Sequence, residues 1–108
     1  MTMPLDKARY AVIFHAQIRR LDEDYAALAE QLRRRAISEY GCLDLQASCD
    51  GEREITVSYW STLEQIAAWK NDPLHLRAQQ LGRTIWYHSY RVEIVELLRD
   101  YASLPGNS

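Results

Sequence analysis

Glycine, proline and cysteine are scarce in this 108-residue sequence, which has four, three and two of them. The glycines do not cluster, and there is no Gly-rich phosphate loop, no GxSxG motif and no dinucleotide-binding fingerprint. A bound flavin or nicotinamide is therefore not expected, and we expect no cofactor. No apolar stretch approaches the roughly 18–20 residues of a membrane span, so no membrane partner is expected. The N-terminus lacks the apolar core of a signal peptide, and a cytoplasmic location is the default expectation.

The sequence also lacks a large excess of either acidic or basic residues. The formal net charge is −2 with acidic and basic residues interspersed, so there is no broad basic stripe and nucleic acid is not an expected partner. The one basic run, Arg33 to Arg35, lies in the last turns of a predicted helix whose first turn is acidic. We interpret this run as a solvated helix end that complements the helix dipole.

The histidines and cysteines show no pair at the spacing of metal ligands, so no metal site is expected. Cys42 and Cys49 are seven residues apart in one predicted strand, which separates them by roughly 23 Å at about 3.3 Å per residue. That distance excludes a disulfide between them. Two free, buried thiols are expected instead.

The residue patterns predict four strands. Tyr10 to Ile18 is β-branched and aromatic, without glycine or proline. Cys42 to Asp50 alternates apolar with polar residues, and the tight-turn signal Asp50-Gly51 joins it to Arg53–Trp60 as an antiparallel hairpin. Ser89 to Arg99 is the last strand, about eleven residues long against the usual five or six.

A long helix is predicted after the first strand. It begins at Asp22 or Glu23 and continues to about Tyr40, with apolar residues at three- and four-residue spacing. Gly41 follows as a helix terminator.

Two helical pieces are predicted between the third and fourth strands. Ser61 is expected to cap the first, with Glu64 completing a capping box. The second is expected to begin at Asp72-Pro73, an N-cap followed by a favourable first residue, and to end at about Gly82 or Trp86.

This order of elements predicts a single domain over residues 9–101, with flexible termini at 1–8 and 102–108. One antiparallel sheet with helices on one face, a ferredoxin-like α+β arrangement, is the economical packing. The uncovered face would expose residues such as Ile13 and Val95, and soluble monomers rarely expose a large apolar patch. We therefore expect a homodimer through the open sheet face, most simply a two-fold one.

The stretch from Tyr59 to Tyr90 holds all three tryptophans and three of the tyrosines. Such clustering indicates either a bulky core or the wall of a pocket for a flat organic molecule. Tyr59, Trp60 and Tyr90 lie in predicted strands, where core packing or a dimer contact is the expected role.

Several segments together resemble the antibiotic biosynthesis monooxygenase family, in particular its small stand-alone bacterial members. They are YAVIF, ITVSYW, IAAWK, HLRAQQLGR and IWYHSYRVEIVEL, and they span roughly Arg9 to Tyr101. The resemblance implies a dimeric α+β barrel with a pocket between helices and sheet. The family includes cofactor-free oxygenases of polycyclic phenols or quinols, haem-degrading oxygenases and members without known activity, so membership implies a pocket and not a reaction.

Four residues are candidates for binding an aromatic ligand. In the family a tryptophan at the place of Trp69 lines the pocket, with core packing as the alternative. Trp86 and Tyr87 lie where the helical pair meets the last strand, and could line a cleft mouth or belong to the core. Arg91 could steady a phenolate, or its strand parity could place it at a dimer interface.

Two histidines are candidates for a catalytic base. His75 is near the N-terminus of a predicted helix, which disfavours its cation, and a neutral imidazole can accept a phenolic proton. The alternative is an exposed histidine that bonds locally. His15 is mid-strand and could be a pocket base, an interface residue or a buried, hydrogen-bonded histidine. His88 is expected at the surface.

The haem-degrading branch makes a sharper comparison. It needs an asparagine in the first strand and a histidine roughly ten residues beyond the tryptophan that Trp69 resembles. The first strand has no asparagine, Gln79 is the residue ten positions beyond Trp69, and His75 is only six beyond it. Haem degradation is therefore not expected.

The leading hypothesis is a cofactor-independent monooxygenase acting on a small or polycyclic aromatic phenol or quinol. Deprotonation would give an electron-rich anion that can pass an electron to O₂ in an apolar slot. The alternatives are a non-catalytic dimeric binding protein for a hydrophobic aromatic metabolite, and a structural dimer whose aromatic residues are core.

Overall fold

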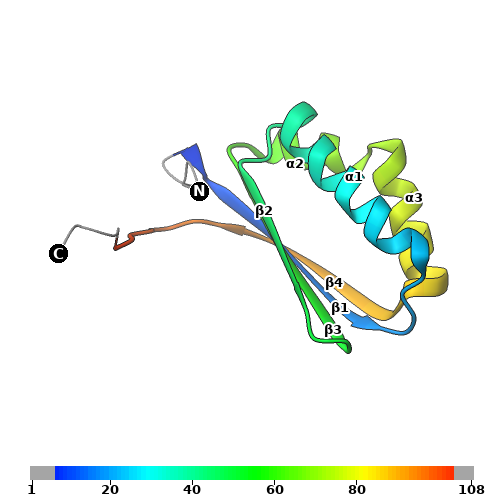
Figure 1. Cartoon of the computed structure of the whole chain (residues 1–108). Coiled ribbons are helices and arrows are strands. Elements are labelled where there is room, and N and C mark those ends of the chain that lie inside the picture. The colour runs from blue at the N-terminus through cyan, green and yellow to red at the C-terminus, as the bar shows by residue number, and fades with distance from the viewer. Residues whose placement is uncertain (1–6, 104–108) are drawn as a thin grey trace.

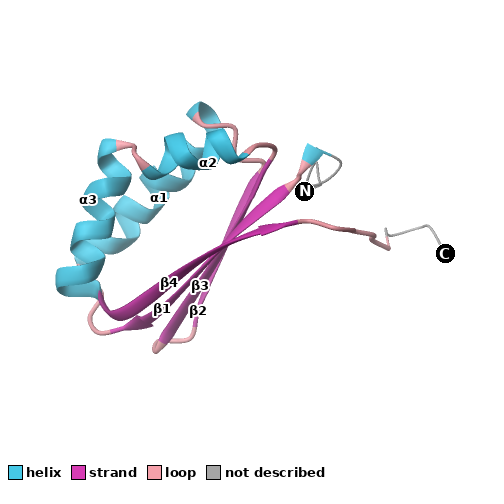
Figure 2. Ribbon diagram, turned by 180° about the vertical axis from the view of Figure 1, so that it is seen from behind, coloured by secondary structure: helices cyan, strands magenta, loops and turns pink. Residues whose placement is uncertain are grey.

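The computed structural model describes residues 7–103, so most of the two predicted flexible termini lies outside the described residues. In chain order the elements are β1 (Tyr10–Ile18), α1 (Glu23–Glu39), β2 (Asp44–Cys49), β3 (Arg53–Trp60), α2 (Leu63–Lys70), α3 (Pro73–Leu81), a π-helical segment η2 (Gly82–Trp86) and β4 (Tyr87–Glu96). The four strands form one antiparallel sheet in the order β2-β3-β1-β4. All three α-helices lie on one face of this strongly twisted sheet (Figures 1 and 2), which confirms the ferredoxin-like α+β prediction.

Strand register decides which residues share a face, because antiparallel partners point to the same side of a sheet. Val12 and Phe14 of β1 pack against the core clusters, so they face the helices. The alternate positions Ile13 and His15 therefore point away from the helices. We call that side the open face.

Two clusters of buried side chains fill the space between the helices and the sheet. One contains Ala36, Cys42, Trp60, Ile66 and Trp69. The other contains Ala16, Leu28, Trp86 and Tyr87. The aromatic stretch is thus divided between two parts of the core.

Local sequence signals account for both ends of α1. The helix begins at Glu23, which agrees with the predicted start at Asp22 or Glu23, and Asp22 is its N-cap and accepts from Asp24 N. Gly41 follows the helix with a φ of 83°, a left-handed conformation that glycine adopts without steric cost. Cys42 N donates to Ala36 O at 3.0 Å, which closes the helix end.

The predicted cap of α2 is wrong by one residue. Thr62 is the N-cap, and its hydroxyl accepts from Gln65 N, while the Gln65 side chain accepts from Thr62 N. The capping box therefore uses Thr62 and Gln65 instead of Ser61 and Glu64. The Ser61 hydroxyl donates to Lys7 O at 2.9 Å and ties the segment before β1 to this corner.

The predicted boundaries of β2 and β4 also differ from the structure. β2 begins at Asp44, two residues later than predicted, and β4 covers Tyr87–Glu96 instead of Ser89–Arg99. A register shift at Gln17 and Ile18 pairs Ile18 with Tyr87, so pairing starts earlier than the residue pattern indicates. Cys42 is buried, but Cys49 is exposed, which corrects the expectation of two buried thiols; both are free.

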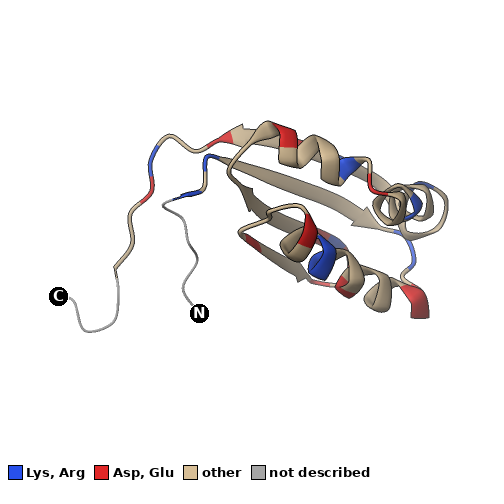
Figure 3. Cartoon of the chain, turned by 90° about the horizontal axis from the view of Figure 1, so that it is seen from above, with Lys and Arg blue, Asp and Glu red and all other residues tan. Residues whose placement is uncertain are grey.

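Acidic and basic positions are interspersed along the ribbon (Figure 3). None of the helices in the described part of the chain has the length and apolarity that a bilayer crossing requires. Among residues 7–103, no group of three or more His, Cys, Asp or Glu side chains is arranged to hold a metal ion.

Candidate functional site

Trp69 and His75 form a stacked pair at the junction of α2 and α3. Their ring centroids are 4.5 Å apart with 27° between the planes. Trp69 is buried and also contacts the Tyr40 ring at 5.4 Å. The imidazole is half-buried, and this burial lowers the pKa of His75 below its usual value. His75 is therefore neutral over a wider pH range than a solvated histidine.

The contacts of His75 Nδ1 decide what Nε2 can do. Nδ1 lies 3.5 Å from Lys70 O and 3.2 Å from Gln79 Nε2. The tautomer with a proton on Nδ1 donates to the carbonyl and leaves Nε2 with a free lone pair, as a general base requires. The other tautomer accepts from Gln79 and carries its proton on Nε2.

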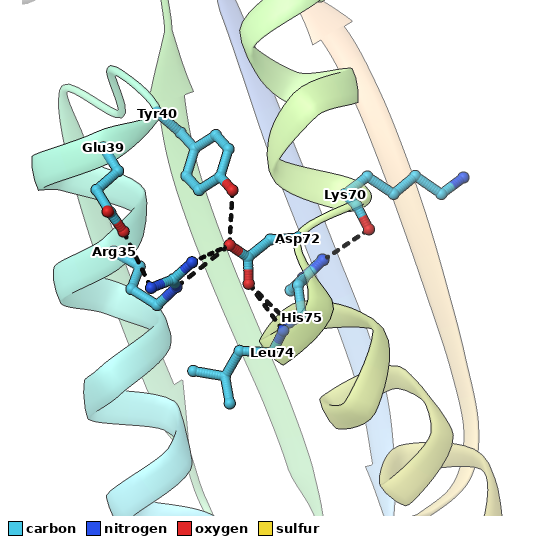
Figure 4. Close-up of polar contacts among 7 residues, drawn as sticks. All are labelled: Arg35, Glu39, Tyr40, Lys70, Asp72, Leu74 and His75. Atoms are coloured by element: carbon cyan, nitrogen blue, oxygen red, sulfur yellow. Dashed lines mark hydrogen bonds and ion pairs between the residues drawn. The ribbon is translucent and has the colours of Figure 1, made fainter.

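The first turn of α3 is held by Asp72, whose side chain lies between that turn and the C-terminal end of α1 (Figure 4). Asp72 is the predicted N-cap and is only 1% exposed. It accepts hydrogen bonds from Arg35 and Tyr40, and the Arg35 contact is the main reason why the pKa of Asp72 lies far below its usual value. Arg35 is thus an ion-pair partner, which corrects its interpretation as part of a solvated helix end.

An apolar ledge lies on the same side of the sheet as the Trp69–His75 pair. Val92 pairs with Phe14 and Ile94 with Val12 across the β1–β4 ladder, so Val92 and Ile94 face the helix side. Val12 packs against the cluster that contains Trp69, which places Ile94 one strand farther out. Val92 and Ile94 are nonetheless 51% and 52% exposed, because β4 is an edge strand that the helices leave partly uncovered. We call these two residues the β4 ledge.

Trp86 and Tyr87 lie elsewhere on the helix side, beneath α1. Trp86 Nε1 donates to Asp22 Oδ1 at 3.2 Å, and its ring meets Tyr25 edge-on with centroids 5.1 Å apart. The Tyr87 hydroxyl donates to Glu54 Oε1 at 3.1 Å. Both residues are buried, and burial is the largest cause that raises the pKa of Tyr87.

His15 and Arg91 meet on the open face. His15 Nε2 lies 2.7 Å from Glu93 Oε1, and Arg91 Nη2 donates to Glu93 Oε2 at 2.9 Å. These contacts, with that of His15 first, lower the pKa of Glu93. His15 and Arg91 line a shallow hollow of about 450 Å³, with Arg53, Ile55 and Ser89 also in its lining.

The predicted site residues therefore form three groups. Trp69 pairs with His75, Trp86 pairs with Tyr87, and His15 pairs with Arg91 through Glu93. The sheet separates the third group from the other two. A larger hollow of about 560 Å³ between Arg20 and Asp24 contains none of the predicted residues. Its lining is mostly charged, so it offers an aromatic ligand little apolar surface.

Three features of the site were missed from the sequence. Glu54 and Trp60 lie an even number of positions apart in β3, so their side chains share a face. Glu54 could therefore have been recognised as a helix-facing carboxyl. The Arg35–Asp72 pair had no sequence signal, because the two residues are 37 positions apart. Val92 and Ile94 share a strand face by their spacing, but only the register shows that this face meets the helices.

Comparison with known proteins gives one close relative in sequence. No family model matches the chain. The uncharacterised protein YqjZ of Bacillus subtilis (strain 168) is 36% identical over 92 residues, which cover 83% of this chain and 80% of YqjZ.

Solved structures share the fold at low sequence identity. Rv0793 from Mycobacterium tuberculosis has a TM-score of 0.70 and 19% identity over 88% of this chain and 100% of its own. An antibiotic biosynthesis monooxygenase has a TM-score of 0.69 and 15% identity, covering 83% of this chain and 99% of its own. SnoaB, a cofactor-independent oxygenase from Streptomyces nogalater, has a TM-score of 0.69 and 7% identity over 91% and 98% of the two chains. These identities show a common fold and do not extend to the chemistry.

Proposed function

We propose that this chain, which belongs to the same family as Bacillus subtilis YqjZ and has the antibiotic biosynthesis monooxygenase fold, acts as a cofactor-independent monooxygenase. Its proposed substrate is a small or polycyclic aromatic phenol or quinol. The substrate lies against the β4 ledge on the helix side of the sheet, and His75 is the base.

One observation carries this proposal: a half-buried imidazole with a lowered pKa lies on the same face of the sheet as exposed apolar side chains. The Val92 and Ile94 side chains would contact the flat face of the substrate. The Trp69 ring stacks on the His75 imidazole at a centroid distance of 4.5 Å. In the tautomer whose Nδ1 proton is donated to Lys70 O, 3.5 Å away, Nε2 is free to accept the substrate proton.

The chemistry balances without a metal or an external reductant. His75 Nε2 takes the phenolic or enolic proton, and the resulting anion passes one electron to O₂. The organic radical and superoxide then combine to form a carbon–oxygen bond. The peroxide anion takes back the proton held by His75, and loss of water from the resulting hydroperoxide leaves a quinone, so one oxygen atom of O₂ enters the product and the other leaves as water. An apolar surrounding favours this sequence, because it keeps bulk water away from the anion.

The test is oxygen consumption by the purified protein with a panel of anthrones and quinols, with product formation followed by absorbance. We expect turnover above the buffer rate, and a loss of about 10²-fold or more in His75→Gln, as is usual when a general base is removed. His88→Gln is the matched control, because His88 is exposed. Absence of turnover, or equal rates for the His75 and His88 variants, would refute the proposal.

A non-catalytic binding protein for a hydrophobic aromatic metabolite is the second candidate. Gln79 Nε2 favours it, because a hydrogen bond to Nδ1 at 3.2 Å selects the tautomer with a proton on Nε2, which cannot act as a base. This function predicts that anthrones and quinols raise the melting temperature of the protein without any product being formed.

We also propose that two copies pair through the open face. Ile55 and Val95 on that face are 43% and 38% exposed, and His15, Arg91 and Glu93 lie between them. A second copy would cover these apolar side chains and leave the β4 ledge on the opposite side accessible. A solution mass equal to a single chain at micromolar concentration would refute this pairing.

A further inference from the structure

The Asp72 carboxylate uses one oxygen for each of two elements. Oδ1 accepts from the backbone N–H groups of Leu74 and His75, at 2.8 and 3.3 Å. Oδ2 accepts from Tyr40 OH at 2.6 Å and from Arg35 Nε at 3.2 Å, and Arg35 Nη2 contacts the same oxygen. Figure 4 shows the two sets of contacts on opposite sides of the carboxylate. The first turn of α3, which carries His75, is thereby fastened to the C-terminal part of α1.

From this geometry we infer that Arg35 is a positioning residue for His75 and acts through Asp72. Arg35 on α1 fixes the Asp72 carboxylate, and the carboxylate fixes the first turn of α3. That turn places the His75 imidazole against the Trp69 ring. The consequence for catalysis rests on the proposed function, whereas the contacts themselves do not.

Leaving the Asp72 carboxylate in place without the Arg35 cation would cost considerable free energy. Asp72 is 1% exposed, and a buried carboxylate without a partner is strongly disfavoured. Tyr40 and the two backbone N–H groups satisfy hydrogen-bonding capacity but bring no opposite charge. Arg35 is the charged partner, and Glu39 in turn orients the guanidinium, with its Oε2 3.1 Å from Arg35 Nη1.

The same contacts set the electrostatic surroundings of the imidazole. The Asp72 charge favours the His75 cation, and the Lys70 charge disfavours it. The positive charge of Arg35, which is on α1, partly offsets the negative charge of Asp72. The negative charge of Glu39 in turn partly offsets that of Arg35. On the helix side of β4, Val92 and Ile94 are uncharged. Removal of Arg35 leaves the Asp72 charge unopposed, so it should favour protonated His75, whereas removal of the Asp72 charge should have the opposite effect.

NMR titration of the histidine ring protons in the full chain tests this inference. The chain has three histidines, so a His75→Gln variant assigns the resonance. In Arg35→Met we expect the His75 pKa to rise by at least about 0.3 unit, a roughly twofold change in the ratio of protonated to neutral ring. In Asp72→Asn, which keeps an acceptor for the α3 cap, we expect it to fall by a similar amount.

The opposite signs separate a positioning role from general loosening, which would expose the ring and raise its pKa in both variants. Arg34→Met is the matched control. Arg34 has the same chemistry and neighbours Arg35, but it pairs with Glu30 at an exposed site, and its loss should leave the His75 titration unchanged. Arg35→Lys keeps the charge and should restore most of the wild-type titration.

Two results would overturn the inference: equal His75 titrations in Arg35→Met and wild type, or a rise in Asp72→Asn. If Arg35→Met does not fold, the fall in Asp72→Asn and the restoration by Arg35→Lys decide the question. The titration needs no substrate. Expected shifts without turnover would therefore refute the proposed reaction and leave the role of Arg35 in place.

Discussion

Replacement of Glu54 by glutamine should change how the stability of this protein depends on pH. Glu54 is 7% exposed on the helix side of β3. Its carboxyl accepts hydrogen bonds from three hydroxyls, those of Tyr25, Tyr87 and Thr56, the last two at 3.1 and 3.2 Å. Within residues 7–103, no Lys, Arg or His nitrogen lies at ion-pair distance from it. Burial, the largest effect, raises the pKa of Glu54 above its ordinary value of 4.5.

The sign of the effect follows from this shift. The folded protein keeps the Glu54 proton to a higher pH than the unfolded chain does. The carboxyl therefore contributes its full stabilisation below about pH 4.5, the unfolded pKa, and the contribution is lost as pH rises through the folded pKa. Glutamine cannot ionise, so Glu54→Gln should lack this loss between pH 5 and pH 8.

The hydrogen bonds set the magnitude. In Glu54→Ala, the buried Tyr87 hydroxyl loses its acceptor, which costs about 1–3 kcal/mol. The Tyr25 and Thr56 hydroxyls belong to half-buried residues and can turn to water, so they add less. We expect a loss of about 2–3 kcal/mol at pH 5 in Glu54→Ala. Glu54→Gln keeps one acceptor oxygen and should lose no more than about 1 kcal/mol at pH 5, with a smaller deficit or a gain at pH 8.

Urea unfolding followed by tryptophan fluorescence at pH 5 and pH 8 measures these differences. Glu52→Gln is the matched control, since the exposed Glu52 is two residues away and should show a difference from wild type that does not vary with pH. A Glu54→Gln deficit that grows with pH, or one equal at both values, would contradict the reasoning, because it would mean that Glu54 ionises in the core without cost.

Two further predictions concern the cysteines and the open face. At pH 8 iodoacetamide should modify the exposed Cys49 within minutes and leave Cys42 unmodified in the folded protein, because burial raises the pKa of Cys42 to about 11; mass spectrometry that finds both thiols modified before unfolding would contradict this. Ile55→Arg should convert the proposed dimer to monomers in a light-scattering measurement, whereas Ile37→Arg on α1, where the native side chain is similarly exposed at 40% against 43%, should not. Equal masses for these two variants would show that the open face is not the interface.

Local signals predicted most of the fold. Asp22, Gly41, Asp50-Gly51 and Asp72-Pro73 end or begin elements through contacts within a few residues, and the structure confirms each of them. The α2 cap was misplaced because serine and threonine stand next to each other, and the choice between them depends on Ser61 reaching Lys7 O, 54 positions away. The start of β4 depends on the π-helical segment and the register shift, which the β-strand pattern does not encode.

The site was less predictable, because parity divides a strand into two faces without saying which one meets the helices. Phe14 and His15 are neighbours in β1 and therefore lie on opposite faces, but only the contact of Phe14 with Tyr87, at 5.5 Å between ring centroids, identifies the Phe14 side as the inner one. The same ambiguity left Arg91 between a ligand role and an interface role. The β1–β4 register resolves its position by pairing it with His15 on the open face.

The arrangement of the two histidines gives the proposed dimer and the proposed site a common logic. A single sheet separates His15 from His75, so one ligand cannot contact both within a chain. If a second copy covers the open face, His15 and its Glu93 contact become part of that interface, and substrate from solution reaches only the helix side. His75 is on that side and has a lowered pKa, while His15 Nε2 is already taken up by its contact with Glu93 Oε1 at 2.7 Å. The contact that suits His15 to an interface therefore keeps its Nε2 from a substrate, and this favours His75 for the chemistry.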